Sequence, residues 1–183
     1  MREGSIVDAS IIAAPNSTKN KEKKRDPEMH RTRKGNQGHF GINLYIGVDD
    51  MTGVVHSLDT TPANTNDLDA ADKLLHDQEQ RVFGDAGYRG IEKRKRRSDR
   101  DVTWYIADVR ANERKWTRTA TRRKPKRSSV RFEQRSSTRF DIPIKRMSGY
   151  DKVRYRGQSK NQDRFDVLAG FTNLLLVDKF VPI

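Results

Sequence analysis

Residues 40–58 read FGINLYIGVDDMTGVVHSL, and this stretch decides the fold class. Up to Val48 its apolar residues recur at every second position, which is the period of a half-buried β-strand. Residues 49–53 have the composition of a turn, and 54–58 are typical of a returning strand. We therefore predict a β-hairpin. Its first strand places five apolar side chains on one face: Phe40, Ile42, Leu44, Ile46 and Val48.

Three further strands are predicted around this hairpin. Ser5–Ile12 reads SIVDASII, which is rich in β-branched residues and places Asp8 in mid-strand. Arg81–Gly84 is a short apolar stretch that ends at Asp85. The third strand is Val102–Ala107, in which Trp104 and Ile106 are expected to face the core together.

Helical patterns separate and follow these strands. Asn66 is a typical N-cap, and a helical stripe follows it at Leu68, Ala71, Leu74 and Leu75. Residues 91–100 predict a basic helix. A C-terminal helix is indicated by an apolar face of Phe165, Leu168, Thr172 and Leu175. An antiparallel start followed by α/β units predicts the α/β class, with a mixed sheet and helices on its faces.

Composition excludes several kinds of protein. The chain has 183 residues and no cysteine, so disulfides and thiolate metal sites are excluded. No apolar run is longer than the four residues of Leu174–Val177, which is too short for a membrane span, and no signal peptide is recognisable. We therefore expect a cytoplasmic protein with no membrane partner. The net charge of +13 favours a polyanionic partner, most often nucleic acid.

The positive charge is concentrated in one segment. Residues 111–141 carry 11 basic and three acidic side chains, with few apolar residues and no apolar period. Such a composition predicts disorder. We therefore divide the chain into a folded part at 1–109, a basic segment at 110–143 and a C-terminal helical part at 144–183. Residues 13–38 are also polar, and we expect a loop or extended arm there.

Asp8 and Asp85 are the candidates for chemistry. An Asp at the carboxyl end of a strand, followed by small residues, lies where α/β sheets bind ligands. Two carboxylates from adjacent strands could hold a divalent metal ion. The alternative is that Asp85 caps a turn and Asp8 is a surface residue of an edge strand. The four histidines are scattered and show no metal-ligand spacing.

Several motifs together resemble the catalytic core of bacterial insertion-sequence DDE transposases, most closely the insertion-sequence-five-like group. They are REGSIVDASII at 2–12, DPEMHRTRKGNQGHFG at 26–41, TTPAN at 60–64, DAGYRG at 85–90 and KVRYRG at 152–157. The resemblance continues through KNQ at 160–162 and FTNLL at 171–175. With their flanking residues these motifs cover about four fifths of the chain, in order.

This resemblance implies a fold, a cofactor and partners. The fold is an RNase H-like sheet with flanking helices, which we expect to be incomplete here. Asp8 and Asp85 match the first and second catalytic aspartates, which bind Mg²⁺ or Mn²⁺ in the family and serve DNA cleavage and strand transfer. The implied partners are insertion-sequence ends and target DNA, with nucleoid association and a homo-oligomer as further expectations. Relatives carry an end-recognition region before this point of the sequence, so we expect non-specific duplex DNA binding here.

The third catalytic carboxylate of the family is not found. In relatives it lies in an R-x3-E-x6-K helix, and seven residues before Lys145 this chain has Thr138. Glu133 is the nearest glutamate, but its surroundings, RFEQRS, do not match. We therefore expect weak metal binding and impaired catalysis. Residues 136–141, SSTRFD, agree with a reading of the family's VEHPFR shifted by one base, so we interpret the segment as frameshifted.

Basic residues next to the family motifs are the candidate DNA contacts. They are Lys93, Arg94, Lys152, Arg154 and Arg156, with Tyr155 among them. Trp116 could stack on a base, although an exposed, unstructured tryptophan is the alternative. Two functions follow from the sequence. The first is a metal-dependent transposase core that is impaired, and the second is a non-catalytic DNA-binding remnant or a non-functional pseudogene product.

Overall fold

The computed structural model of the protein describes residues 4–76, 78–91, 102–107, 116–118 and 149–177. Its strands are β1 (Gly4–Ala13), β2 (His30–Lys34), β3 (Gln37–Asp49), β4 (Val55–Pro62), β5 (Arg81–Gly84), β6 (Thr103–Ala107) and β7 (Trp116–Arg118). The helices are α1 (Asp67–Ala70), the 3₁₀ helices η1 (Ala71–Leu74) and η2 (Ala86–Tyr88), and α3 (Gln158–Val177). Of the helix predicted at 91–100, residues 92–100 lie outside the described residues, and so does Glu133.

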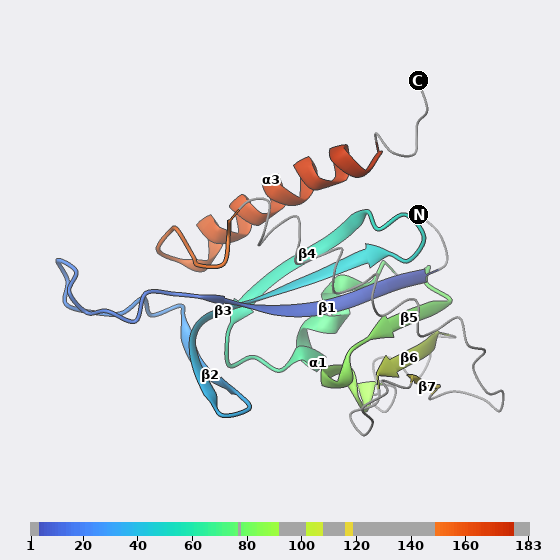
Figure 1. Ribbon diagram of the computed structural model, residues 1–183, viewed down its shortest axis with the longest axis horizontal. Coiled ribbons are helices and arrows are strands. Elements are labelled where there is room, and N and C mark those ends of the chain that lie inside the picture. Colours follow the sequence, from blue (N-terminus) through green and yellow to red (C-terminus); the bar gives the residue numbers. More distant parts are fainter. Residues whose placement is uncertain (1–3, 77, 92–101, 108–115, 119–148, 178–183) are drawn as a thin grey trace.

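The strands form one mixed sheet with helices on both sides. The order is β2-β3-β1-β5-β6-β7, and β4 also pairs with β3. β1 pairs antiparallel with β3 and parallel with β5. α3 lies on one side of the sheet and α1 on the other (Figure 1). This α/β architecture agrees with the RNase H-like sheet that the resemblance implies.

The predicted hairpin is present and is longer than predicted. The side chains of Ile42, Leu44, Ile46 and Val48 are all in the core cluster that also contains Phe165 and Leu168 of α3. Tyr45, on the opposite face, packs with α1, η1 and β6. At the turn, Asp49 Oδ1 accepts the backbone N–H groups of Met51 and Thr52 at 3.1 and 2.7 Å. Gly53 then adopts a positive φ of 74°, which favours glycine.

Two predictions for the N-terminal half need correction or extension. The polar stretch 13–38 is not a loop throughout, because β2 lies within it and pairs with the start of β3. Asn66 caps α1 as predicted, since its side chain accepts the N–H of Leu68. However, α1 covers only four residues before the chain tightens into η1.

The C-terminal half corrects two further predictions. In α3, Phe165, Leu168 and Thr172 are buried as predicted, whereas Leu175 is 57% exposed. The side-chain amide of Asn173 hydrogen-bonds to the backbone of Val55, which is the first residue of β4. Leu175 comes two residues later in α3 and therefore lies past the strand. Trp116 belongs to β7, which pairs with β6, although the sequence predicted disorder there. Trp104 and Ile106 are both buried in one cluster, as predicted.

One glycine of β3 allows β1 and β3 to approach closely. A Cβ at Gly41 would collide with the backbone carbonyl oxygen of Ile12 in β1, which has no freedom to move aside. We expect Gly41→Ala to destabilise the protein by about 1–3 kcal/mol, as overpacking does. Gly38→Ala, in the same strand, is the control because nothing lies within 4 Å of its Cβ position. Thermal unfolding of the two variants checks this, and equal Tm values would contradict it.

Candidate active site

The pairing of β1 with β5 brings the two candidate aspartates together. The parallel register runs from Gly4 opposite Arg81 to Val7 opposite Gly84. Asp8 directly follows Val7, and Asp85 directly follows Gly84. The expected adjacency of the two aspartate strands is thus confirmed. Both aspartates lie where β5 ends, and we call this place the acidic edge.

Each aspartate has a local hydrogen bond that holds its carboxylate. Asp8 Oδ1 accepts the N–H of Ala9 at 2.8 Å, and Asp85 Oδ1 accepts the N–H of Gly87 at 2.9 Å. Asp85 therefore does cap the turn into η2, as the alternative interpretation held. Capping and ligand binding are compatible, because a carboxylate has two oxygens with about four acceptor sites.

A third carboxylate, which the sequence analysis did not select, approaches the same edge. Asp67 begins α1, and its Oδ1 accepts the hydroxyl of Tyr45 at 3.1 Å. A Cβ at Gly87 would lie 2.6 Å from Asp67 Oδ2 and 3.0 Å from Asp85 Oδ1. The absence of a side chain at Gly87 therefore lets these two carboxylates converge. Burial raises the pKa of Asp67, and the neighbouring charge of Asp85 acts in the same direction.

Tyr88 lies beneath this edge. Its side chain is fully buried, and among the described residues its hydroxyl finds no hydrogen-bond partner. Burial is the main cause that raises the pKa of the Tyr88 hydroxyl, and the charges of Asp67, Asp8 and Asp85 raise it further. The phenol therefore stays neutral, and all three carboxylates are close enough to act on it. The only hint in the sequence was the position of Tyr88 three residues after Asp85.

The carboxylates at this edge are the kind of ligand that a hard divalent cation binds, but the described residues alone do not form a complete set of ligands. Carboxylate oxygens are the ligands that Mg²⁺ and Mn²⁺ prefer. Within the described ranges, however, no three His, Asp or Glu side chains are arranged to hold a metal ion. Asp8 and Asp85 therefore remain the candidate ligands within these ranges. Asp67 is directed to Tyr45 and Gly87 instead.

The candidate DNA contacts divide into two groups. Lys93 and Arg94 lie outside the described residues. Lys152, Arg154, Tyr155 and Arg156 are all exposed and lie together in the segment that leads into α3. This segment is tied to β1, because Ala13 and Lys152 form a β-bridge and Val153 donates its N–H to the Ala13 carbonyl at 2.9 Å.

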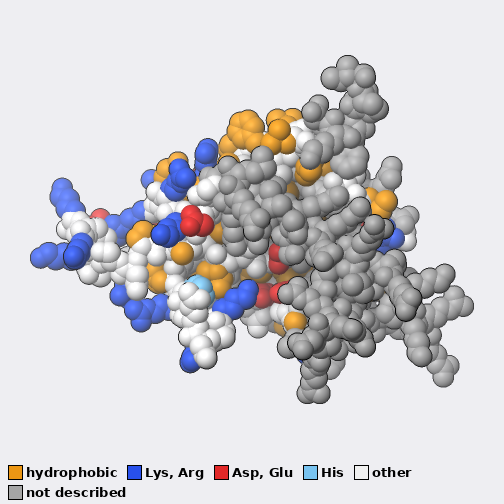
Figure 2. All heavy atoms as spheres, viewed as in Figure 1, with side chains coloured by type: hydrophobic (Ala, Val, Ile, Leu, Met, Phe, Trp, Pro, Cys, Tyr) orange, Lys and Arg blue, Asp and Glu red, His pale blue; other side chains and the backbone are white. Residues whose placement is uncertain are grey.

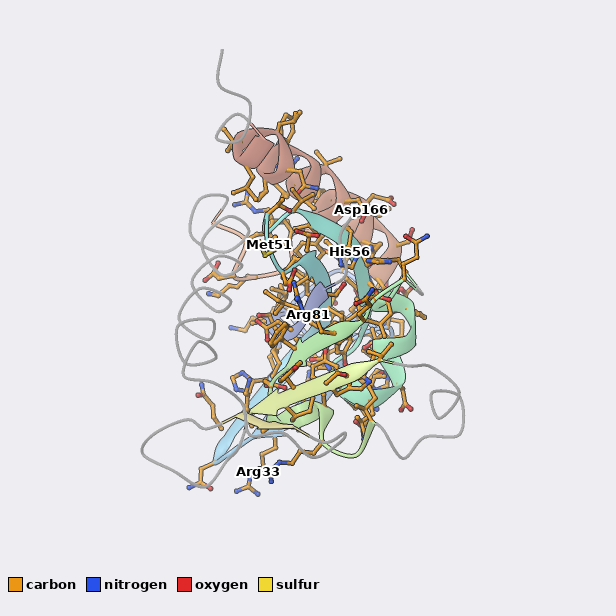
Figure 3. All side chains as sticks on the ribbon, turned by 90° about the vertical axis from the view of Figure 1, so that its right-hand side faces the viewer. Arg33, Met51, His56, Arg81 and Asp166 are labelled. Carbon is orange, nitrogen blue, oxygen red and sulfur yellow. The ribbon has the colours of Figure 1, made fainter. Side chains whose placement is uncertain are left out.

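The structure adds basic surfaces that the sequence analysis did not select. We name residues 14–29 the arm, which extends from the sheet between β1 and β2 (Figure 1). Lysine and arginine side chains gather on this extension and on the neighbouring hairpin (Figure 2). They are Lys19, Lys21, Lys23, Lys24 and Arg25 in the arm, and Arg31, Arg33 and Lys34 in β2, all exposed. Arg33 lies at the end of the molecule opposite α3 (Figure 3).

A second polar cluster surrounds the amino end of β1. Ser5 Oγ lies 3.1 Å from His56 Nε2 and donates to Glu79 Oε1 at 3.4 Å. The rings of His56 and His76 are 5.1 Å apart, so the fold brings together two histidines that are distant in the sequence. Ser5 is completely buried, which excludes it as an accessible nucleophile. This cluster is therefore a packed polar network.

We expect this network to make stability depend on pH. Burial lowers the pKa of His56 and the charge of His76 lowers it further, while Glu79 and Asp49 oppose the shift. Below about pH 6.5 the unfolded chain therefore takes up a proton that the folded chain resists. We expect the Tm to fall as the pH is lowered from 7.5 to 5, and to fall less in His56→Gln. His30→Gln, at an exposed site, is the control, and identical pH profiles for all three proteins would exclude this role.

A comparison with protein-family models completes the description of the site. A family model described as "Transposase DDE domain" matches residues 1–174. The match includes β1, which carries Asp8, and β5, which Asp85 follows, and it continues through most of α3. In the part of the chain that the structure describes, no helix is both long and apolar enough to cross a membrane.

Proposed function

Because the chain belongs to the family of transposase DDE domains, we propose that it is the catalytic core of an insertion-sequence transposase, of the insertion-sequence-five-like group, with impaired strand cleavage. The observation that carries this proposal is the register of β1 and β5, which makes Asp8 and Asp85 neighbours. Domains of this family generally use divalent metal ions, which stabilise the charge that develops on phosphodiester oxygens during transfer.

The residues of this chain prepare the edge for such chemistry. Asp8 and Asp85 would hold the ion, each oriented by a backbone N–H group. Tyr88 fills the space beneath them with a neutral ring, which excludes water from that side. Asp67 adds negative charge next to Asp85, which favours a bound cation over an empty site.

A non-catalytic DNA-binding remnant is the second candidate. It is favoured by the sequence, in which Thr138 stands where the family pattern has its third catalytic carboxylate. It is also favoured by the exposed basic side chains of the arm and of residues 152–156, which would bind DNA whether or not Asp8 and Asp85 hold metal.

A nicking assay on supercoiled DNA distinguishes the two candidates. We expect weak cleavage that requires Mg²⁺ or Mn²⁺ and is abolished in Asp85→Asn, which keeps the shape of the side chain but removes its charge. Asp59→Asn is the matched control, because Asp59 is a carboxylate of β4 that pairs with Lys73 on the surface. DNA binding without any metal-dependent nicking by the unchanged protein would instead support the remnant.

A further inference from the structure

A pocket lies between the arm and the segment that leads into α3. Its volume is about 350 Å³, within the range of ligand sites in proteins. Met29 and Val153 line it and belong to the same core cluster as Phe165 of α3. Both are buried, at 4% and 8% exposure, so the pocket rests on packed core rather than on mobile chain.

Specific contacts hold the two walls of this pocket in place. Asp26 accepts the N–H of Gly157, and Glu28 accepts the N–H of Gln158, each at 2.7 Å. An ion pair of 2.7 Å joins Arg156 to Glu22. Since Asp26 and Glu28 satisfy backbone donors at the start of α3, their carboxylates serve the structure of the wall.

The lining combines positive charge with an exposed ring. Its cationic side chains are Lys19, Arg25, Arg154 and Arg156, against one lining carboxylate, that of Asp26. Arg154 lies over the ring of Tyr150, with 5.6 Å between the guanidinium carbon and the ring centroid. Tyr155 lines the pocket and is nevertheless 46% exposed, so its ring is available to an incoming group.

We propose that this pocket binds one unpaired nucleotide of a DNA strand. Its base would stack on Tyr155, and the adjoining phosphates would lie against Arg154, Arg156 and Lys19. A base in a duplex is already stacked on both faces, so an exposed ring in a basic pocket suits a single strand. This inference deepens the proposed function and rests on it for the identity of the polyanion.

The place of the pocket fits that role. Ala14, in the pocket lining, directly follows β1 and comes six residues after Asp8, which corresponds to about 20 Å along an extended chain. Ile6 and Ile12 belong to the same core cluster as Met29 and Val153. Asp8 shares the face of these two isoleucines by the two-residue period of a strand. The pocket and the Asp8 carboxylate therefore lie on the same side of the sheet.

The test compares two DNA probes on the full chain. One is a blunt duplex, and the other is the same duplex with a short single-stranded 3′ extension that contains 2-aminopurine. We expect the extended probe to bind about tenfold more tightly, the effect of stacking one base, and its 2-aminopurine fluorescence to be quenched. Tyr155→Leu should lose both the preference and the quenching, and Tyr155→Phe should keep both. Phe171→Leu is the control, since Phe171 is an exposed aromatic residue of α3.

Each outcome separates the pocket from the general function. If the unchanged protein binds both probes equally, the pocket proposal is wrong and DNA binding stands. If Tyr155→Leu weakens both probes equally at an unchanged Tm, Tyr155 is a general contact and the proposal is again wrong. If neither probe binds, the proposed function fails together with the pocket.

Discussion

Raising the salt concentration from about 50 to about 200 mM is expected to weaken duplex DNA binding by roughly 10³-fold. The net charge is +13, and the described part of the chain exposes basic side chains in the arm, in β2 and at 152–156. If these neutralise about six phosphates, the logarithm of the binding constant falls against the logarithm of salt concentration with a slope of about −5. Filter binding at several salt concentrations measures this slope.

Two variants assign the slope to a surface. Replacing Lys19, Lys21 and Lys23 by Gln removes three exposed charges from the arm and should make the slope less steep by up to about 2.7. Lys73→Gln, whose ammonium group pairs with Asp59 at 3.0 Å in the unchanged protein, should leave the slope unaltered. A flat salt response, or a marked preference for one duplex sequence, would count against this mode of binding.

Local patterns predicted β1, which carries Asp8, and β3, which pairs with it. The two-residue period of β3 and the β-branched residues of β1 are properties of the segments themselves, and both strands formed as expected. β2 was missed because HRTRK has no apolar alternation. Its strand conformation depends on pairing with the first five residues of β3, as in the pairing of Arg31 with Phe40. Such a tertiary cause is not visible in the five residues alone.

The candidate site was predicted in part for the same reason. Asp8 and Asp85 were selected from their place in strands, and the register made them neighbours. Asp67 was not selected from the sequence, in which it only follows the N-cap residue Asn66. Its convergence with Asp85 depends on the missing side chain of Gly87, which belongs to a different element. The pocket likewise joins residues more than a hundred positions apart, and no periodic pattern predicts such a meeting.

Restoring the reading frame of residues 115–145 is expected to increase metal-dependent DNA nicking by roughly 10²–10³-fold, the effect of one well-placed charge-stabilising group. The nucleotides GTC GAG CAC CCG TTT CGA encode VEHPFR. Read one base later they give TCG AGC ACC CGT TTC GA, which encodes SSTRF followed by Asp or Glu. Residues 136–141 of this chain are SSTRFD.

On this hypothesis the codon of the missing glutamate, GAG, is divided between the codons of Ser136 and Ser137. A first shift would lie near Lys115 and a compensating one between Asp141 and Lys145. A segment read out of frame has no selected apolar period, so its sequence does not favour an amphipathic helix. The frameshift hypothesis also explains the 11 basic residues of 111–141, as a result of reading the codons out of phase.

The coding DNA decides the first step of this prediction. It should contain GTCGAGCA, or a synonymous equivalent, across codons 135–138, and any other sequence there would refute the frameshift. The frame-restored protein then tests the second step. Its gain in nicking should disappear when the restored glutamate codon is changed to one for glutamine, and also in Asp85→Asn. A gain that survives both changes would show that the restored segment acts by packing on the sheet and not by completing the set of carboxylates, because neither change alters the size of a side chain appreciably.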